Sequence, residues 1–492
     1  MCGFVGLIGD NPVAHELGVA LCAIQHRGQD AAGAAVLDVD GMVRVHKDLG
    51  LVTQVLTQSV LDRALPGRVG IGHVRYPTAG SGGREDAQPF AIRRPSMALA
   101  HNGNVINVPE VEAHLRERGM KLTSACDAEP IMCVLADELG VRQLAHQTTA
   151  DVVHAVGQVL ERVRGSYSVV CALEVDDRET LVAFRDPHGI RPAVYGRRAD
   201  GAWMVASESV ALDVLDFVFV GHIPAGYVAL FRANQEPVLL PVRPESRRPC
   251  VFEGVYFARP DSRTETGRVL DFRARLGRRL ADAWTHKGLP IDVVVAVPDT
   301  SRPAADAMAI ALGVRSEEGF IKNRYSGRTF IMPNDAVRQA ALRLKLNPID
   351  EVFRDRHVVL VDDSVVRGNT MRKIIGMVRR HDPKSLHVAI FSPAVRHPCF
   401  YGIDMPSRDE LVAGRIAPEQ VEAQLAVQLG ADSLTFLSEA ALVEEAGTAV
   451  CAACFNGEYV VPLADHERTW ILRDRRPNTT NAPSRDTLSH QE

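Results

Sequence analysis

The pattern of hydrophobic and polar positions divides this 492-residue chain into two halves. In the first half, apolar segments broken by Gly and Asp predict strands at 2–9, 31–38, 43–50, 68–76, 96–107, 165–175, 181–189 and 202–209. The segment at 96–107 is expected to be a strand followed by a turn. Helices are expected at 18–29, 109–119 and 129–140. Because strands and helices come in blocks, the pattern predicts a layered α+β domain.

A segment rich in Pro and charge, at 233–249, marks the predicted domain boundary. After it, apolar strands at 292–298, 357–363 and 385–393 alternate with helical segments at 268–284, 303–313 and 370–380. This alternation predicts an α/β domain with a parallel sheet, which binds ligands at the carboxyl ends of its strands. The polar tail at 474–492 is expected to be disordered.

The composition is that of a globular protein, with 46% hydrophobic and 24% charged residues. A net charge of −5 argues against nucleic acid or an acidic membrane as the main partner. No apolar run has the roughly 20 residues of a membrane span. The first residues lack a signal-peptide pattern, because Asp10 and Pro12 interrupt them. We therefore expect a cytoplasmic protein whose nine cysteines form no disulfides.

The most informative stretch of the second half is VVLVDDSVVRGNT, at 358–370. An apolar strand ends at the adjacent acids Asp362 and Asp363, and a short loop then leads to a helix N-terminus. Backbone N–H groups and hydroxyls in such a loop can bind a phosphate, with help from the helix dipole. The two acids could accept hydrogen bonds from sugar hydroxyls. The alternative is a plain strand–turn–helix with an acidic turn.

This stretch resembles the signature of the phosphoribosyltransferase family, whose type I members bind 5-phosphoribosyl-1-pyrophosphate (PRPP). The resemblance implies that Asp362 and Asp363 hold the ribose hydroxyls. It implies a 5′-phosphate loop made of Ser364, Val365, Val366, Arg367, Gly368, Asn369 and Thr370. AVPDTS, at 296–301, resembles the pyrophosphate loop of the family and contributes Asp299, Thr300 and Ser301. Mg²⁺ would accompany the pyrophosphate near Ser301, Asp362 and Asp363. The family commonly has Thr or Gly at the position of Asn369.

A basic segment at 322–348 is interrupted by Gly327 and Pro333. It is either a solvated loop or a mobile lid that closes over a polyanion and excludes water. It resembles the closing loop of glutamine PRPP amidotransferases. That resemblance implies lid roles for Lys322, Arg324, Arg328 and Lys345.

At the other end of the chain, MCGFVGLIG places Cys2 directly after the initiator Met1. Removal of Met1 would give Cys2 both a thiol, with a usual pKa of about 8.5, and an α-amine, with a usual pKa of about 8. That amine could take the proton of the thiol, so one residue would supply the nucleophile and its general base. A second-position cysteine alone is more often an ordinary start.

Four further motifs follow Cys2: HRGQD at 26–30, GHVRYPTAG at 72–80, AHNGN at 100–104 and CDAE at 126–129. In order and spacing they resemble the class II glutamine amidotransferases, N-terminal-nucleophile hydrolases with a four-layer αββα fold. The resemblance implies that Cys2 attacks the glutamine amide, while the Asn102 side chain and the Gly103 N–H stabilise the oxyanion. It further implies that Arg75 and Asp127 bind the α-carboxylate and α-amine of glutamine.

Each of these residues also has an ordinary structural interpretation. HNGN is a good hairpin turn, Arg75 could form a surface ion pair, and Asp127 could cap the helix that follows it. The family usually has hydroxyl residues on both sides of the acid, where this chain has Cys126 and Ala128.

Four of the remaining cysteines are candidates for a metal centre: Cys250, Cys399, Cys451 and Cys454. Four thiolates suit either a tetrahedral zinc or a 4Fe-4S cluster, and spacing does not choose between them. Resemblance to the cluster-bearing bacterial branch of the family implies a structural 4Fe-4S cluster. The other possibility is four buried free thiols. Cys22, Cys133 and Cys171 are expected in the core.

Taken together, residues 2–460 resemble the amidophosphoribosyltransferase family. The resemblance implies a glutaminase domain at 2–240 and a phosphoribosyltransferase domain at 250–460. Ammonia from glutamine would displace pyrophosphate from PRPP and give 5-phosphoribosylamine in purine synthesis. Family behaviour also implies a homo-oligomer, a dimer or tetramer, that purine nucleotides inhibit. Two alternatives are another class II amidotransferase and a PRPP-sensing regulatory protein without turnover.

Overall fold

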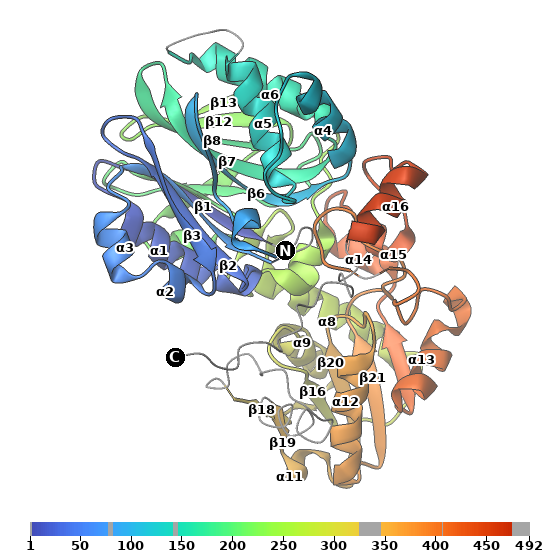
Figure 1. Cartoon of the computed structure of the whole chain (residues 1–492). Coiled ribbons are helices and arrows are strands. Elements are labelled where there is room, and N and C mark those ends of the chain that lie inside the picture. The colour runs from blue at the N-terminus through green and yellow to red at the C-terminus, as the bar shows by residue number, and fades with distance from the viewer. Residues whose placement is uncertain (1, 77–81, 141–145, 324–345, 406, 475–492) are drawn as a thin grey trace, which may run out of the picture.

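A computed structural model describes residues 2–76, 82–140, 146–323, 346–405 and 407–474. Within these ranges, no helix is both long and apolar enough to cross a membrane. Figure 1 shows a larger N-terminal region of sheets and helices above a C-terminal α/β region, with the last helices beside the junction between them.

The first of two large sheets in the N-terminal region has seven strands. Their order across the sheet is β11 (Val218–His222), β9 (Val194–Arg197), β10 (Trp203–Ala206), β1 (Gly3–Ile8), β4 (Val69–Arg75), β2 (Ala31–Leu37) and β3 (Val43–Leu49). All neighbouring strands in it are antiparallel. β1, which follows Cys2, lies near the middle of this sheet and is buried along its whole length.

The second sheet has six antiparallel strands. Their order is β13 (Val238–Pro241), β12 (Tyr227–Phe231), β8 (Arg178–Arg185), β7 (Gly165–Val175), β6 (Ser96–Val105) and β5 (Phe90–Arg93). Phe4 of β1 packs between the sheets with Val170 and Leu181. Val5, the next residue of β1, points to the opposite side and packs with Leu17 and Leu21 of a covering helix, as the alternation of a strand requires.

Helices cover the outer face of each sheet. The first sheet is covered by α1 (Ala14–Ala23), α2 (Val52–Val55), α3 (Gln58–Arg63) and α7 (Val210–Asp213). The second sheet is covered by α4 (Val108–Glu117), α5 (Ala128–Gly140) and α6 (Thr149–Arg162), as Figure 1 shows. The predicted four-layer αββα arrangement is therefore confirmed.

The C-terminal region is built on a parallel five-stranded sheet, which confirms the α/β prediction. The strand order is β17 (Arg315–Ser316), β16 (Val293–Ala296), β20 (His357–Asp362), β21 (Ser385–Ile390) and β22 (Ser433–Phe436). Helices α8 (Val269–Thr285) and α9 (Arg302–Leu312) pack on one face. Helices α12 (Asn369–Val378) and α13 (Val421–Leu429) pack on the other, with α11 (Asp350–Phe353) at one end. Gly277 lets α8 and α9 cross closely, because a Cβ there would lie 2.1 Å from the Ala304 carbonyl oxygen.

Smaller elements complete the fold. A π-helix, η3 (Glu253–Phe257), follows the linker, and β18 (Phe320–Lys322) pairs with β19 (Leu346–Pro348). The chain ends with α14 (Glu439–Ala446), α15 (Ala453–Asn456) and α16 (Asp465–Asp474). Glu467 of α16 accepts a 2.9 Å hydrogen bond from Arg164 of the N-terminal region. The C-terminal helix therefore packs back against the first half of the chain.

Several sequence-based expectations differ from the structure. Cys22 is exposed on α1, whereas Cys133 and Cys171 are buried as expected. The HNGN motif continues strand β6 instead of forming a turn, because it pairs with β7 from His101 to Asn104. Helix α6 had not been expected. The tail at 474–492 was predicted to be disordered. Asp474 instead ends helix α16, and residues 475–492 lie outside the described part of the chain.

Candidate active sites

Cys2 lies at the start of β1, beside the end of β4. Its Sγ donates a hydrogen bond to the Tyr76 carbonyl oxygen at 3.5 Å. Burial raises the pKa of the Cys2 thiol, and the positive charges of the N-terminus and Arg75 oppose this only in part. The thiol is therefore mostly protonated at neutral pH, and a nearby base is needed to form the thiolate.

The two expected oxyanion donors, Asn102 and Gly103, lie on β6, which stands next to the edge strand β5 of the second sheet. Asn102 is fully buried, and neither its Nδ2 nor its Oδ1 has a hydrogen-bond partner in the described part of the chain. Leaving a buried amide unpaired typically costs about 1–3 kcal/mol. An unpaired amide of this kind is a natural binding group for a ligand. A Cβ at Gly103 would lie 2.1 Å from the Ser166 carbonyl oxygen, so the close pairing of β6 with β7 requires glycine.

The two residues expected to bind the α-groups of glutamine are both buried. Arg75 ends β4, and its guanidinium lies 3.5 Å from Asp86, so a surface ion pair is not its role. Asp127 accepts a 2.9 Å hydrogen bond from the Val105 amide and lies 3.4 Å from His101 Nε2. Burial tends to raise the pKa of Asp127, but His101 and the Val105 amide outweigh it and lower that pKa overall. Asp127 is therefore a charged carboxylate beside β6, the strand that carries Asn102 and Gly103.

The loop around Asp127 compensates for its missing hydroxyl residues. Glu129 accepts hydrogen bonds from the Thr123 and Ser124 hydroxyls, each at 2.6 Å, and from both of their amides. Cys126 is buried, and Gln88 Nε2 donates to its sulfur at 3.7 Å. The hydroxyls that order this turn therefore precede the acid instead of flanking it. Neither the contacts of Glu129 and Gln88 nor the pairing of Asp86 with Arg75 was predicted from the sequence.

In the second half, Asp362 ends β20 and Asp363 follows it at the carboxyl edge of the parallel sheet. Burial, followed by the neighbouring Asp363, raises the pKa of Asp362 well above its usual value. Burial also raises the pKa of Asp363 to about 6, although the Ser364 hydroxyl and Arg273 oppose the shift. Two adjacent carboxylates, of which Asp363 is buried and Asp362 half-buried, favour a partner that brings a positive charge or hydroxyl hydrogens.

The loop after these acids has the form of an anion site. The N–H groups of Val365, Val366, Arg367 and Gly368 donate to no acceptor among the described residues. Gly368 has φ of +74° and caps the N-terminus of α12, so Asn369 and Thr370 form the first turn of that helix. Free amides at a helix N-terminus are the usual ligands of a phosphate.

The neighbouring strand β16 leads into the expected pyrophosphate loop. Asp299 is exposed and forms a 2.6 Å ion pair with Lys322 of β18. The Thr300 carbonyl accepts a 3.5 Å hydrogen bond from Arg273. The buried Ser301 hydroxyl donates to the Val297 carbonyl and so stabilises the turn before α9. Of the predicted lid residues, Arg324, Arg328 and Lys345 lie outside the described residues.

Comparison with known proteins agrees with this geometry. A glutamine amidotransferase domain model matches residues 78–214, and a phosphoribosyl transferase domain model matches 271–398. Amidophosphoribosyltransferase of Pseudomonas aeruginosa is 41% identical, with 98% of each chain covered. That of Escherichia coli is 40% identical, with 99% of this chain and 97% of its own covered.

The chain belongs to the amidophosphoribosyltransferase family. A solved structure, glutamine PRPP amidotransferase from B. subtilis complexed with ADP and GMP, shares 33% identity with it. The TM-score is 0.83, over 94% of this chain and 98% of that one. The chain is thus an enzyme of the glycosyltransferase class that carries out the first step of purine biosynthesis. The phosphoribosyl transferase match argues against another class II amidotransferase.

The four candidate metal-binding cysteines of this family member lie together where the linker meets the C-terminal segment. Cys250 and Cys451 form a β-bridge, and the Tyr401 amide donates to Cys399 Sγ at 3.3 Å. Burial and the neighbouring thiols raise the pKa values of Cys451 and Cys454. Burial also raises the pKa of Cys250, while Arg191 opposes this. A bound metal would deprotonate these neutral thiols, because the thiolate is the form that binds a metal.

Proposed function

We propose that this enzyme divides its reaction between the two regions. At the first, the Cys2 thiolate attacks the side-chain carbonyl carbon of glutamine, ammonia leaves, and water hydrolyses the thioester to glutamate. At the second, ammonia attacks ribose C1 of PRPP, and the bond from C1 to pyrophosphate breaks. The products are 5-phosphoribosylamine, glutamate and pyrophosphate. The free, buried amide of Asn102 is the observation that carries the first half of this proposal.

The first site would bind glutamine through opposite charges. The Arg75 guanidinium would hold the α-carboxylate and the Asp127 carboxylate the α-amine. The Asn102 Nδ2 and the Gly103 N–H would then receive the developing oxyanion. Once Met1 is removed, the α-amine of Cys2 would act as the general base. The low pKa of Asp127 supports this assignment, because only a charged carboxylate binds an ammonium group strongly.

The second site would hold PRPP along the carboxyl edge of the parallel sheet. Asp362 and Asp363 would accept hydrogen bonds from the ribose hydroxyls, and the amides from Ser364 to Thr370 would bind the 5′-phosphate. The pyrophosphate would lie on Asp299, Thr300 and Ser301. Lys322 would contribute positive charge there together with the lid residues Arg324, Arg328 and Lys345. The free loop amides support this arrangement.

The residues of the second site fit a bound Mg²⁺. Asp362 and Asp363 are adjacent, and their raised pKa values mean that a cation would relieve their mutual repulsion. The Ser301 hydroxyl already donates to Val297, so it would offer a lone pair only. A bound Mg²⁺ would mask the negative charge of the pyrophosphate.

The four cysteines fit a 4Fe-4S cluster better than zinc. Among the described residues, no three of these sulfur atoms all lie within 4.8 Å of one another. The sulfurs of a tetrahedral zinc site stand about 3.8 Å apart. In a 4Fe-4S cluster each cysteine binds a different iron, so the ligand sulfur atoms stand further apart than around one zinc. The cluster would be structural, joining the linker to the C-terminal segment through Cys250 and Cys451.

Similarity to the relatives also suggests an oligomeric state and a form of regulation for this enzyme. We propose that it forms a homo-oligomer, a dimer or tetramer, and that purine nucleotides inhibit it. The structural relative in complex with ADP and GMP supports nucleotide binding. We also propose a cytoplasmic location. Free thiols such as those of Cys22, Cys133 and Cys171 suit a reducing compartment.

One experiment tests the proposed reaction. Protein with a processed N-terminus is incubated with glutamine, PRPP and Mg²⁺, and release of pyrophosphate and glutamate is measured. Equal amounts of both products are expected. No pyrophosphate release would contradict the proposed function and favour a PRPP-sensing protein without turnover.

A further inference from the structure

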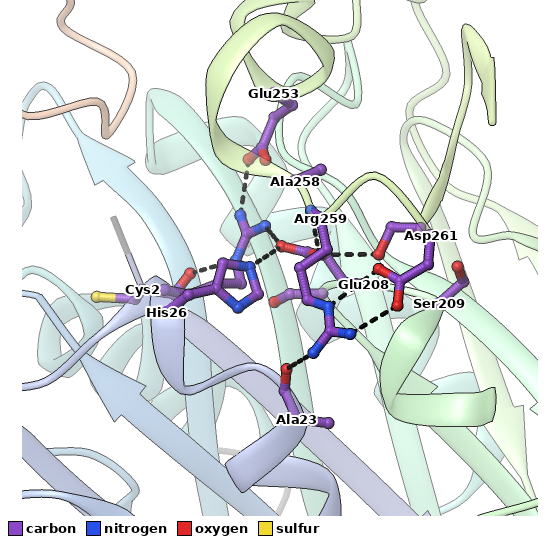
Figure 2. A network of polar contacts seen from close by, with 12 residues as sticks. Cys2, Ala23, His26, Glu208, Ser209, Glu253, Ala258, Arg259 and Asp261 are labelled. Carbon is purple, nitrogen blue, oxygen red and sulfur yellow. Dashed lines mark hydrogen bonds and ion pairs between the residues drawn. The ribbon is translucent and has the colours of Figure 1, made fainter. Parts of the chain in front are cut away.

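A fully buried arginine connects the nucleophile to the second half of the chain. Arg27 lies in a short 3-10 helix after α1, and its Nε donates to the Cys2 carbonyl oxygen at 3.0 Å. Its two terminal nitrogens form ion pairs with Glu208 and, at 2.8 Å, with Glu253. Figure 2 shows Cys2, Glu208 and Glu253 around this network, with the sulfur of Cys2 directed away from it. The backbone of the nucleophile therefore depends on how Arg27 is held.

Two of the groups that contact Arg27 come from beyond the linker. The π-helix η3 supplies the Glu253 carboxylate, and the ring of Phe257, also from η3, lies 5.2 Å from the Arg27 guanidinium carbon. Glu208 belongs to the first half, but it accepts hydrogen bonds from the Ser262 hydroxyl at 2.9 Å and the Arg259 amide at 3.1 Å. The second half of the chain thus sets the position of Arg27 both directly and through Glu208.

A second buried arginine connects η3 to the pyrophosphate loop. Arg273 of α8 donates to the Gly254 carbonyl at 2.9 Å, the Ala258 carbonyl at 2.8 Å and the Thr300 carbonyl at 3.5 Å. It forms no ion pair with any carboxylate of the described residues, and burial lowers its pKa to about 10. Its charge is therefore available to attract an anion bound at the loop. A shift of the loop would also move the carbonyls at both ends of η3.

This network places buried arginines beside buried carboxylates, and His26 of the first half adds a 2.8 Å contact to Glu208. Arg191 lies 3.7 Å from Glu253, so two buried guanidiniums, Arg27 and Arg191, share the carboxylates Glu208 and Glu253. Removing one carboxylate leaves a buried positive charge without compensation, which displaces the groups around it. The Nε bond of Arg27 to the Cys2 carbonyl is among the contacts that such a displacement would change.

We propose that Glu253 is a positioning residue for the Cys2 nucleophile, and that Arg273 and η3 link its position to the pyrophosphate loop. This inference rests on the proposed two-site function. Glu253 does not touch either substrate. It holds Arg27 through an ion pair, and Arg27 holds the backbone of Cys2 through a hydrogen bond.

The direct test is Glu253→Gln, which keeps the shape of the side chain and removes its charge. Glu265→Gln is the matched control. Glu265 is equally buried, also comes from beyond the linker, and pairs at 2.7 Å with Arg185, a buried arginine of the first half. Glu265 forms no hydrogen bond or ion pair with Arg27 or Cys2 in the part of the chain that the structure describes. A general loss of stability at the junction would therefore affect both variants.

Three measurements distinguish a role of Glu253 in positioning Cys2 from a purely structural role. For Glu253→Gln we expect an increase of about tenfold or more in KM for glutamine, with ammonia-dependent pyrophosphate release within about twofold of the parent. We also expect slower alkylation of Cys2 by iodoacetamide. Glu265→Gln should match the parent in all three. A glutamine KM that is unchanged in Glu253→Gln, or increased equally in Glu265→Gln, would overturn the inference.

The link to the pyrophosphate loop needs its own variant. Arg273→Lys keeps the charge but loses the planar fork that contacts three carbonyls. In the parent, PRPP should change the rate of Cys2 alkylation by several fold, and in Arg273→Lys this response should be lost. No response in the parent, or a full response in the variant, would overturn the link. Parent protein that makes no product from glutamine and PRPP would instead refute the proposed function.

Discussion

The Val105 amide donates a 2.9 Å hydrogen bond to the Asp127 carboxylate, which ties the proposed glutamine-binding acid to the strand that carries the oxyanion donors. Binding and catalysis at the first site thus share one rigid element, β6. Asn102 and Gly103 lie three and two positions before Val105 on the same strand. A change at Asp127 should therefore weaken glutamine binding without changing the PRPP site.

Asp127→Asn should raise KM for glutamine by about tenfold to a hundredfold, because a charged hydrogen bond to the α-amine is lost. The ammonia-dependent reaction should keep its rate. Steady-state kinetics with glutamine and with ammonium chloride give both values. An equal loss in both reactions would contradict the role of Asp127 in glutamine binding.

Asn102→Ala should lower kcat with glutamine by about 10²–10³, the typical cost of losing one oxyanion donor. The free energy of unfolding should change little or increase, because the Asn102 amide is buried without a partner in the described part of the chain. Denaturant titration measures the second effect. A destabilised protein with nearly normal kcat would show that Asn102 is structural.

Asp363→Asn should stabilise the protein at neutral pH while abolishing turnover of PRPP. Because the pKa of Asp363 is raised to about 6 in the folded state, its contribution to stability falls as pH rises from about 4 to 6. At pH 7 the amide should therefore gain on the order of 1–2 kcal/mol over the carboxylate. Denaturant titration at pH 4 and pH 7 should show the gain only at pH 7. A gain of equal size at both would contradict the charge argument.

Anaerobically purified protein should be brown and contain about four irons per chain. Cys399→Ser should lose the colour and the iron, whereas Cys22→Ser, which removes an exposed thiol remote from the four, should keep both. Metal analysis and the visible absorption spectrum measure this outcome. A colourless protein that contains one zinc per chain would contradict the cluster.

Local sequence patterns predicted the structure correctly where one apolar segment forms one strand or helix. The strands ending at Asp362 and before Asp299 are buried on both faces, so their apolar runs predicted the parallel sheet. HNGN was misleading because tertiary pairing with β7 overrides its turn propensity. Helix α6 had a usable pattern, since Val152, Val156 and Val159 share one face after a Thr148 N-cap.

Contacts between residues far apart in the chain could not be predicted from such local patterns. Arg27 meets Glu208 across 181 positions and Glu253 across 226. HRGQD suggested a family motif, yet nothing near it indicates which carboxylates neutralise the arginine. Likewise, exposed Cys22 lies in an apolar run, and only the packing of α1 shows that its side chain faces outward.

The division of labour between two sites is the central claim, and Cys2→Ala tests it most directly. Pyrophosphate release from PRPP should be measured with glutamine and with ammonia as nitrogen donors, in the parent and the variant. We expect the variant to lose the glutamine-dependent reaction and keep the ammonia-dependent one within about twofold. Loss of both reactions, or retention of the glutamine-dependent one, would contradict the account.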